Sequence, residues 1–302
     1  MGTVDLDVES TLKNRKFLSL LLLALLVTYL IPFPLISGAL QDYSHLKAIH
    51  ERMVKENDAI VCHNVLDTNP DFFSSNGMKC DDTYYRPNES TVSSGDLLVY
   101  EDTYNEYLRA EEALKSDIPD FGAFVLIAFL STLLFSYAMV DFAVGLSEGL
   151  EKNPLECIVS SLRALPYLVA AEILVLIVLV FIVILLAILL SIFGLLREVV
   201  VGLIAAPAFA LVVPAYYFTR NVEVVGTIWG VAKRNAAGYL ALGAGLTLID
   251  IIMAFQYNLS LGIWTRPLMI LLGSIRYPLN SLGALKVYLD AEVEKDVENM
   301  GG

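Results

Sequence analysis

The sequence predicts an all-α, polytopic membrane protein with six transmembrane helices and one sizeable segment outside the bilayer. Three observations predict this class. The chain of 302 residues is 56% hydrophobic with a mean hydropathy of +0.63, which is high for a soluble globular protein. Its apolar residues gather into runs of about 20, the length that a helix needs to cross a ~30 Å hydrocarbon core. Basic residues gather in the short connections between these runs.

Six apolar runs are the expected spans. The sixth is interrupted by Arg276, Pro278 and Asn280, which makes it the least regular of the six. The runs are 17–37, 121–143, 166–192, 199–218, 236–255 and 267–286. Short clusters of small residues at 202–210 and 238–245 are typical of helices that pack closely in membranes.

The basic residues of the short loops orient the chain. With six spans, the basic connections all fall on one side, which the positive-inside rule makes cytoplasmic. Both termini join that side, so we expect a multi-pass protein of the cell membrane with cytoplasmic termini. The alternative for the first run is a cleaved signal peptide ending near Ser37-Gly38-Ala39, but the run is long for the apolar core of such a peptide. The orienting residues are Lys13, Arg15, Lys16, Lys152, Arg163, Arg220, Lys233 and Arg234.

The expected domains follow from these spans. Residues 1–38 form the cytoplasmic N-terminus and first span, 39–118 an acidic extracytoplasmic domain, 119–288 the remaining bundle and 289–302 an acidic cytoplasmic tail. The net charge is −13, and residues 40–118 alone hold sixteen acidic against seven basic side chains. Such a surface argues against nucleic-acid binding by the outer domain. We interpret the acidity as a solvated surface rather than a cation site.

Two amphipathic patterns border the outer domain and predict a helical stalk beneath a cap. Both patterns run directly into a span, so we expect two antiparallel helices that continue spans one and two. Residues 58–95 are rich in Asn, Asp, Ser, Gly and Pro, which indicates a loop-rich cap. The residues at near-helical spacing are Leu40, Tyr43, Ile49 and Met53 in the first pattern, and Tyr100, Tyr104, Tyr107 and Leu114 in the second. The side chains expected to be buried between the helices are Tyr43, Ile49, Tyr100 and Tyr104.

Cysteine usage predicts one disulfide in the cap. Cys62 and Cys80 lie in the exported, oxidising segment, which holds no third cysteine, so we expect them to be joined. The bond would constrain a loop that is too polar to build its own core. Cys157 lies on the cytoplasmic side and is expected to be a buried thiol.

The histidines and sequons of the outer segments are weaker signals. All three histidines lie in the outer domain, but the i,i+5 spacing of His45 and His50 does not place them on one helix face. We therefore expect no metal site and no cofactor. Asn88 in the cap and Asn258 in an outer loop each begin a glycosylation sequon, whose use depends on the organism.

The odd-numbered spans are preceded by similar segments. Each segment joins a short, partly amphipathic stretch to a basic residue or cluster and then enters the membrane. This pattern predicts three helical-hairpin repeats, each with an interfacial helix, a span, an outer turn and a second span. We expect residues 222–234 to form such an interfacial helix, with a related one around 154–163. The helix either plugs the bottom of the bundle or couples the inner surface to spans five and six, and the sequence gives no support to the second interpretation.

A resemblance rests on two stretches. PAYYFTRNVEVVGTIWGVAKRNAAGYLALG, residues 214–243, has a proline-bearing span end, an amphipathic segment with Trp229 and the next span, and LKVYLDAE at 285–292 has a Tyr-x-Asp ending. Over about residues 120–295 the chain resembles six-helix membrane families. These include the membrane domain fused to glycerophosphodiester phosphodiesterases and uncharacterised bacterial and archaeal relatives. The resemblance implies a helical-hairpin membrane module and no catalytic residues.

Charges inside the spans are the remaining lead. Asp141 and Glu172 lie near the inner ends of spans two and three, whereas Asp250 and Arg276 lie deeper. Counting the helix rise from each end puts Asp250 and Arg276 at depths that differ by only ~5 Å in neighbouring spans. We expect them to form an intramembrane charge pair, because an unpaired charge at that depth is costly. We favour a structural pair, and a functional site is the alternative.

The motif search limits the function. The sequence contains no P-loop, zinc-protease helix, nucleophile elbow or dinucleotide fingerprint. We expect a non-enzymatic integral membrane scaffold or assembly component that presents the acidic outer domain. The alternative is a channel, transporter or export-apparatus subunit with Asp250 and Arg276 in the membrane interior, and a membrane-embedded enzyme comes third. The expected partners are the lipid bilayer and a protein bound through the outer domain, with a homo-oligomer left open.

Overall fold

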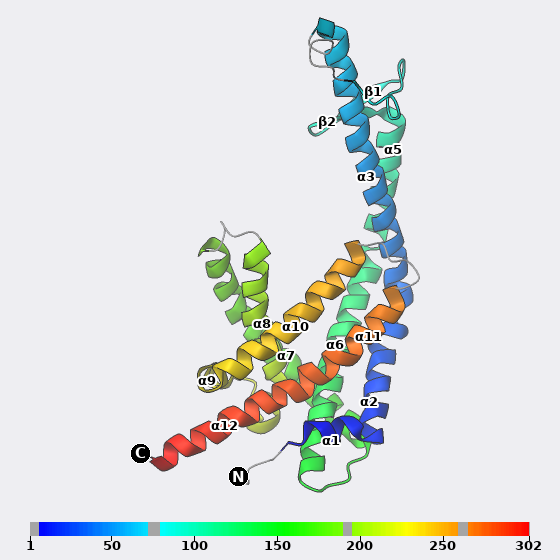
Figure 1. The fold of residues 1–302 in the computed structure, drawn as a ribbon. Helices are drawn as coiled ribbons and strands as arrows, with labels where there is room; N and C mark the ends of the chain where they lie inside the picture. Colours follow the sequence, from blue (N-terminus) through cyan, green and yellow to red (C-terminus); the bar gives the residue numbers. More distant parts are fainter. Residues whose placement is uncertain (1–5, 72–78, 190–194, 259–264, 302) are drawn as a thin grey trace. The chain divides into compact units, whose positions relative to one another are not determined.

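The computed structural model describes residues 6–71, 79–189, 195–258 and 265–301, and these are mostly helical (Figure 1). The chain divides into two compact units. The bundle unit comprises Met1–Pro32 and Leu126–Gly302, and the hairpin unit comprises Phe33–Val125.

The helices of the bundle unit are long and apolar. Among the described residues, five helical segments are suited by length and composition to cross a membrane, and a sixth is added if Arg15–Leu30 and Phe33–Thr68 count as one broken span. The all-α, multi-pass class is therefore confirmed. The elements are α1 Val8–Lys13, α2 Arg15–Leu25, the π-helix η1 Leu26–Leu30, α6 Ile118–Ser147, which begins in the hairpin unit, α7 Pro154–Leu189, α8 Leu195–Thr219, α9 Val225–Arg234, α10 Ala236–Asn258, α11 Thr265–Pro278, the π-helix η4 Leu279–Gly283 and α12 Ala284–Gly301.

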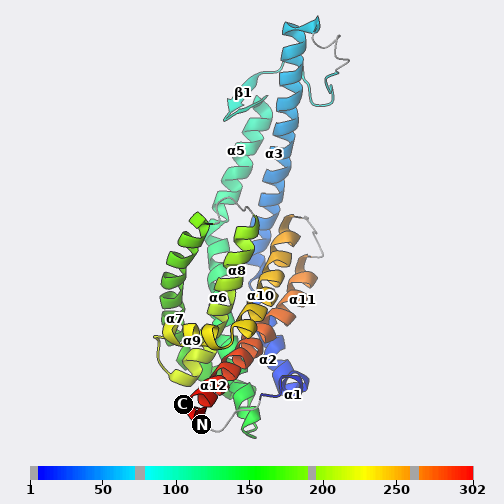
Figure 2. The same ribbon diagram turned by 60° about the vertical axis from the view of Figure 1, so that its left-hand side comes forward.

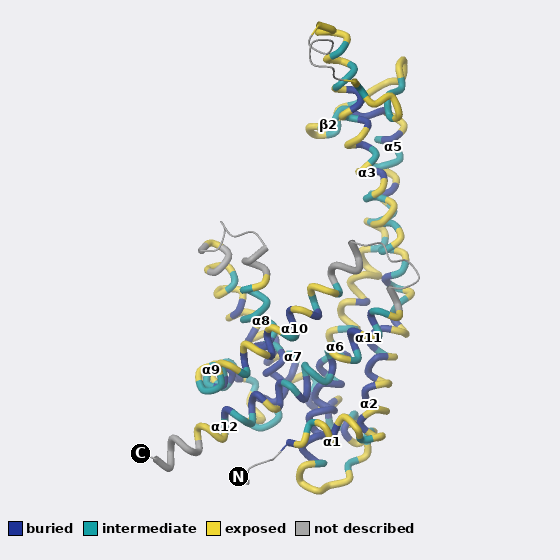
Figure 3. The backbone as a smooth tube through the Cα atoms, in the orientation of Figure 1, coloured by how far each residue is buried: buried dark blue, intermediate teal, exposed yellow. Residues whose placement is uncertain are grey.

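The surface of α7 shows what surrounds the bundle. The tube in Figure 3 changes repeatedly between exposed and buried along α7. The exposed residues are large and apolar, whereas Leu168, Ala171 and Val175 on the same helix are buried. A helix with an exposed apolar face is stable in contact with lipid rather than water. The exposed residues include Ile173, Leu176, Ile177, Val180, Phe181 and Ile184.

Asparagine caps three helices of the bundle unit. The side chains of Asn14, Asn153 and Asn235 accept hydrogen bonds from backbone N–H groups in the first turns of α2, α7 and α10. Each cap satisfies one of the amides that a helix N-terminus leaves unpaired. These helices correspond to the odd-numbered spans expected from the sequence.

The segments that precede these spans differ from one another. α9 is a separate short helix, because α8 ends at Thr219 and Asn235 separates α9 from α10. The expected helix over 222–234 is therefore confirmed as an element. The related helix around 154–163 is wrong as a separate element, since α7 runs without a break from Pro154 through Pro166. No glycine or asparagine lies between 154 and 165 to end the helix, and proline is tolerated in membrane helices.

Small residues bring α8 and α10 into close contact, as their clustering predicts. A Cβ atom at Gly243 would lie 2.5 Å from the Leu203 carbonyl oxygen, so α10 packs there directly on the backbone of α8. A Cβ atom at Gly202 would lie 2.7 Å from the Thr247 side chain. Close backbone approach of this kind is what small residues provide in membrane helices.

The interrupted sixth run is a helix that contains a π-helical turn. η4 follows Pro278, whose ring nitrogen cannot donate to the preceding turn. The freed polar groups find other partners. The Ser281 hydroxyl donates to the Tyr277 carbonyl at 2.7 Å, and the Asn280 amide donates to the Ser136 hydroxyl at 3.0 Å.

The hairpin unit consists of two long helical segments and a small β-hairpin (Figure 2). Its elements are α3 Phe33–Thr68, β1 Thr91–Ser94, β2 Leu97–Tyr100 and α5 Glu101–Ser116. β1 and β2 pair antiparallel around Gly95-Asp96, and Gly95 has φ +61°, which suits glycine in a two-residue turn. The small core is formed by Ile49, Met53, Val99 and Ala110, with Leu46, Val92, Leu97, Tyr104 and Tyr107 packed against it.

The stalk expectations are partly wrong. The second amphipathic pattern begins as strand β2 and becomes helical only at Glu101, because the Gly-Asp turn pairs Leu97–Tyr100 with β1 and two of these residues, Val99 and Tyr100, favour strands. Tyr43 is 46% exposed, since beside it α3 and α5 leave a shallow apolar groove of about 430 Å³. Ile49 and Tyr100 are buried as expected, and Tyr104 is half-buried.

The expected continuity with the spans holds on one side. α5 and α6 are separated by Asp117 alone. In contrast, the first span does not continue into α3, because Ile31–Pro32 separate η1 from the helix that begins at Phe33. Proline has no amide to donate and is tolerated in the first turn of a helix, where Pro34 lies.

Candidate functional site

The disulfide holds the cap of the hairpin unit. The Cys62 and Cys80 sulfurs are 2.09 Å apart, with a Cα–Cα separation of 5.7 Å, so the expected pair is formed. Next to Cys62, the His63 ring stacks on Tyr85 with centroids 3.7 Å apart, and its Nε2 lies 3.0 Å from an Asp82 carboxylate oxygen. The disulfide and the ring stack together attach residues 80–85 to α3. In the described part of the chain, no group of three or more His, Cys, Asp or Glu side chains is arranged to hold a metal ion.

Arg86 is the central residue of the hairpin unit. Its guanidinium donates to both oxygens of Asp102 at 2.7 and 3.0 Å and to Glu56 at 3.1 Å. It also lies over the Tyr100 ring, 4.1 Å from the centroid. The bond to Asp102 raises the pKa of Arg86, and the same bond lowers the pKa of the Asp102 carboxyl. One side chain therefore connects the loop, α3 and the start of α5.

Glu56 is the buried carboxylate of this network. Its side chain is 4% exposed, and it accepts from the Thr103 hydroxyl at 2.8 Å and from the Tyr100 amide at 3.4 Å in addition to Arg86. The fully satisfied carboxylate links the middle of α3 to the strand–helix junction. Sequence reasoning missed this network, although a lone arginine within a strongly acidic loop is a signal for it.

The structure describes the asparagine of both sequons, but only the Asn88 sequon is described in full. Asn88 is exposed in the cap and adopts φ +76°, a left-handed conformation that asparagine tolerates in turns. Asn258 is the last residue of α10, and the remainder of its sequon lies outside the described residues.

The expected ion pair between Asp250 and Arg276 is formed. An Arg276 guanidinium nitrogen lies 3.1 Å from Asp250 Oδ1, across the α10–α11 contact. The side chains are 38% and 44% exposed in the isolated chain, so the pair lies toward the surface of the bundle unit. The Tyr29 phenol of η1 interacts electrostatically with both charges.

The π-helical turn η1 contacts α11 next to this pair. The hydroxyls of Thr28, in η1, and Tyr277, one residue before Pro278, are hydrogen-bonded in the interior. The Tyr29 and Tyr277 rings meet edge to face at 6.4 Å. Gly273 makes room for this contact, because a Cβ atom there would lie 2.6 Å from the Tyr29 ring.

A second ionic cluster lies where α6 ends and α7 begins. Asp141 is buried and accepts from Lys152 at 2.6 Å and from the Tyr217 hydroxyl at 2.9 Å. Gly145 accommodates the lysine stem, since a Cβ atom there would lie 2.7 Å from it. Cys157 is fully buried in the same region, as expected for a structural thiol. The cluster holds α6, α8 and the α6–α7 connection together.

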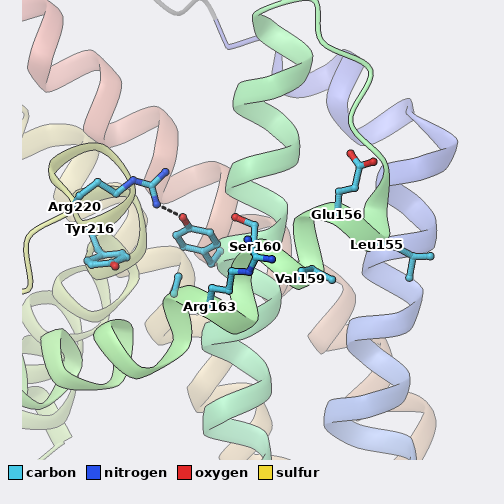
Figure 4. A pocket seen from close by; sticks show the side chains of 9 residues that line it. Leu155, Glu156, Val159, Ser160, Arg163, Tyr216 and Arg220 are labelled. Atoms are coloured by element: carbon cyan, nitrogen blue, oxygen red, sulfur yellow. Dashed lines mark hydrogen bonds between the residues drawn. The ribbon is translucent and has the colours of Figure 1, made fainter.

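A pocket of about 560 Å³ with two arginines in its lining lies between α6, α7 and the end of α8 (Figure 4). Arg163 of α7 and Arg220, which follows α8, both line it. The Arg220 guanidinium donates to the Tyr137 hydroxyl and lies 4.9 Å from the centroid of the Tyr217 ring. The remaining lining residues are Leu155, Glu156, Val159, Ser160, Ala164 and Tyr216.

Glu172 is a buried carboxyl with one unpartnered oxygen among the described residues. It is 8% exposed on α7, and its Oε2 atom has no hydrogen-bond partner in the described part of the chain. A polar atom in this condition departs from the usual satisfaction of buried groups and marks a position to test for function.

Comparison with models of protein families, with curated proteins and with solved structures finds no match to this chain. The resemblance to six-helix membrane families therefore stays a prediction. The function of this chain is therefore inferred from its own geometry.

Proposed function

We propose that this protein is a non-enzymatic membrane scaffold or assembly component that presents the hairpin unit outside the cytoplasm. The bundle unit anchors it in the bilayer, and the hairpin unit binds a partner protein. The polar groups of the hairpin unit support this proposal, because they are used to hold its segments together. Arg86 is bonded to both Glu56 and Asp102, and Glu56 also accepts from the Tyr100 amide.

The charge of the hairpin unit indicates the chemistry of the partner. Residues 40–118 carry a net charge of −9, from sixteen acidic and seven basic side chains. Several carboxylates are exposed and stand outside the Arg86 network. A surface of this charge favours a partner with a basic face and accelerates their encounter at low salt. The exposed carboxylates include Glu51, Asp58, Asp67, Glu101 and Glu112.

The orientation and the repeat belong to the same proposal. The basic connections support cytoplasmic termini, and a disulfide in the hairpin unit supports an oxidising compartment on the opposite side. Asparagine caps at the starts of α2, α7 and α10 support three helical hairpins of common construction. Cysteine-accessibility labelling at exposed positions of the two units tests the orientation, and labelling of both from the same side would contradict it.

The partner is tested by cross-linking the full chain in its native membrane and identifying the captured protein. We expect capture to fall at least several-fold when Glu51, Asp58 and Glu112 are changed to Gln, Asn and Gln, because the basic face loses its counter-charges. The matched control changes Glu148, Glu151 and Glu156 of the bundle unit to Gln and leaves capture unchanged. Equal capture by both triple variants contradicts the scaffold proposal.

Transport or channel activity is the second candidate, and Glu172 is the observation that favours it. A buried carboxyl with an unpartnered oxygen in a span is a feature of proton and cation pathways. Proteoliposomes containing the full chain are tested for proton flux with an internal pH dye and an imposed gradient. A flux that Glu172→Gln abolishes supports transport, and equal leakage from protein-free vesicles excludes this proton pathway.

A further inference from the structure

The pocket beside Arg163 and Arg220 is lined by both polar and apolar side chains and is built from three separate stretches of the chain. Tyr137 belongs to α6, Arg163 and Ser160 to the first third of α7, and Tyr216 and Arg220 to the end of α8. Figure 4 shows the Arg163 side chain on α7 and the Arg220 side chain on the turn that follows α8, with the Tyr137 hydroxyl bonded to Arg220. Its volume of about 560 Å³ is ample for a phosphate group and its substituents.

Both arginines stand without a carboxylate partner. In the described part of the chain, the Arg220 guanidinium forms one hydrogen bond, to a phenol, and two cation–π contacts, whereas Arg163 forms no ion pair. Glu156 also lines the pocket, but in Figure 4 it extends away from Arg220, and it is bonded to neither arginine. The other acid nearby, Asp141, is already bonded to Lys152 and Tyr217. Within the described residues, neither arginine is therefore neutralised by a bonded carboxylate.

The backbone at Arg220 is held in an unfavourable conformation. Arg220 has φ +54°, in the left-handed region that bulky residues seldom adopt. Its amide donates to the Tyr216 carbonyl at 2.8 Å, which closes the last turn of α8. A glycine or asparagine would meet this conformation at lower cost. The turn directs a guanidinium into the pocket, and strained residues of this kind concentrate at functional sites.

The pocket lies at the level of the ends of the apolar spans. Arg220 comes directly after the apolar segment Val199–Thr219, and Arg163 lies three residues before the apolar run that begins at Pro166. The Tyr167 and Tyr216 rings stack beside it at 6.2 Å. Tyrosines and arginines at the ends of spans lie at the depth of lipid headgroups, and basic pockets between helices on the cytoplasmic side bind such headgroups.

We propose that this pocket binds a phosphate-bearing anion through the guanidinium groups of Arg163 and Arg220, with Tyr137 and Ser160 as neutral donors. Guanidinium groups present paired N–H donors that match phosphate oxygens. One guanidinium group is enough to bind a carboxylate, so two in one pocket favour the larger charge and the additional oxygens of a phosphate. The phosphate is supplied by an anionic phospholipid or by a soluble phosphate. This inference concerns the bundle unit and stands independently of the partner proposed for the hairpin unit.

The test measures binding to the purified full chain in detergent by native mass spectrometry. The probes are phosphatidylglycerol, diacylglycerol, which lacks the phosphate, and inorganic phosphate. We expect phosphatidylglycerol to bind more tightly than diacylglycerol, and Arg163→Gln to weaken its binding about tenfold or more. Arg163→Lys keeps the charge without the paired donors and should give an intermediate loss. Because Arg163 forms no ion pair within the described residues, Arg163→Gln should keep the wild-type melting temperature in the absence of ligand.

The matched control is Arg15→Gln, which removes an exposed cation from the same side of the bundle but outside the pocket, and should change binding less than twofold. Tight phosphatidylglycerol binding without phosphate binding identifies the lipid headgroup as the source. Inorganic phosphate binding that Arg163→Gln removes identifies a soluble source. Equal phosphatidylglycerol binding by wild type, Arg163→Gln and Arg15→Gln, with no phosphate binding, overturns the proposal.

Discussion

The two units stabilise their helices in different ways. The hairpin unit has a small apolar core around Ile49 and Met53, and it adds a disulfide and the ionic network of Arg86. The bundle unit places α8 and α10 in direct backbone contact through Gly243. The difference follows from the solvent that each unit is suited to.

Two helices and a two-stranded hairpin bury little apolar surface in water, so the hairpin unit needs additional links. In lipid, by contrast, apolar burial gives little preference for helix contact over lipid contact. Close packing and polar pairs then decide the association. The disulfide and the Arg86 network of the hairpin unit therefore have the same role as the glycine contacts of the bundle unit, which is to hold helices together. A substitution at any of these positions should destabilise one unit and leave the other unchanged.

The largest expected effect is the loss of the disulfide. Changing Cys62 and Cys80 to Ser should destabilise the hairpin unit by ~3 kcal/mol, from the 18-residue sequence separation that the bond closes. Hydrogen exchange followed by mass spectrometry measures this in the full chain, and exchange should rise in α3 and α5 but not in α8 and α10. A reductant should have the same effect on the wild type and none on the double variant. Equal acceleration in both units would contradict the separation between them.

Gly243→Ala should have the next largest effect, and in the bundle unit alone. The added Cβ atom would meet a backbone carbonyl at 2.5 Å, so α8 and α10 must separate. We expect ~2–3 kcal/mol of destabilisation, measured by unfolding in mixed detergent. Gly226→Ala is the matched control, because nothing lies within 4 Å of its Cβ position and alanine favours the helix α9. An unchanged stability of Gly243→Ala would mean that the contact is not essential.

Spans and pairs were predictable where one physical rule acts alone. Apolar run length predicted the spans, and the shared oxidising segment predicted Cys62–Cys80. Counting helix rise predicted the Asp250–Arg276 pair, since both residues lie on regular helices whose depth follows from position.

The rest depends on how separate segments meet. The Arg86 network forms because the β-hairpin brings Tyr100 and Asp102 beside α3. The sequence pattern was interpreted as helical over 95–100, so neither the β-hairpin nor the network was predicted. Tyr43 was predicted to be buried from its periodicity, but periodicity does not show how far two helices diverge. Arg220 belongs to a left-handed turn that sequence alone marks poorly, because glycine or asparagine is usual there.

Asp250→Asn tests whether the bundle unit also depends on charge pairs. We expect a loss of ~1–2 kcal/mol, since Arg276 is left without its carboxylate and both side chains are partly exposed. Adding Arg276→Gln should restore part of the loss, and the double-mutant cycle gives the coupling. Additive effects of the two changes would exclude the pair as a source of stability.

The smallest expected effect is the pH dependence of the hairpin unit. Hydrogen bonding from Arg86 lowers the pKa of Asp102 in the folded protein, so its contribution to stability is present above the unfolded-state pKa of ~3.9 and is lost as the pH falls through the folded value. Because the Asp102 side chain is 64% exposed, solvent screens the interaction and we expect less than ~1 kcal/mol. Hydrogen exchange of α5 measured from pH 6 down to pH 3, and corrected for the intrinsic exchange rate, should show the loss at the acidic end.

Asp102→Asn should reduce that change, whereas Asp58→Asn, which removes an exposed carboxylate outside the network, should leave it as in the wild type. Equal pH profiles for the two variants would mean that the acidic surface as a whole, rather than the Arg86–Asp102 bond, sets the response of this unit to acid.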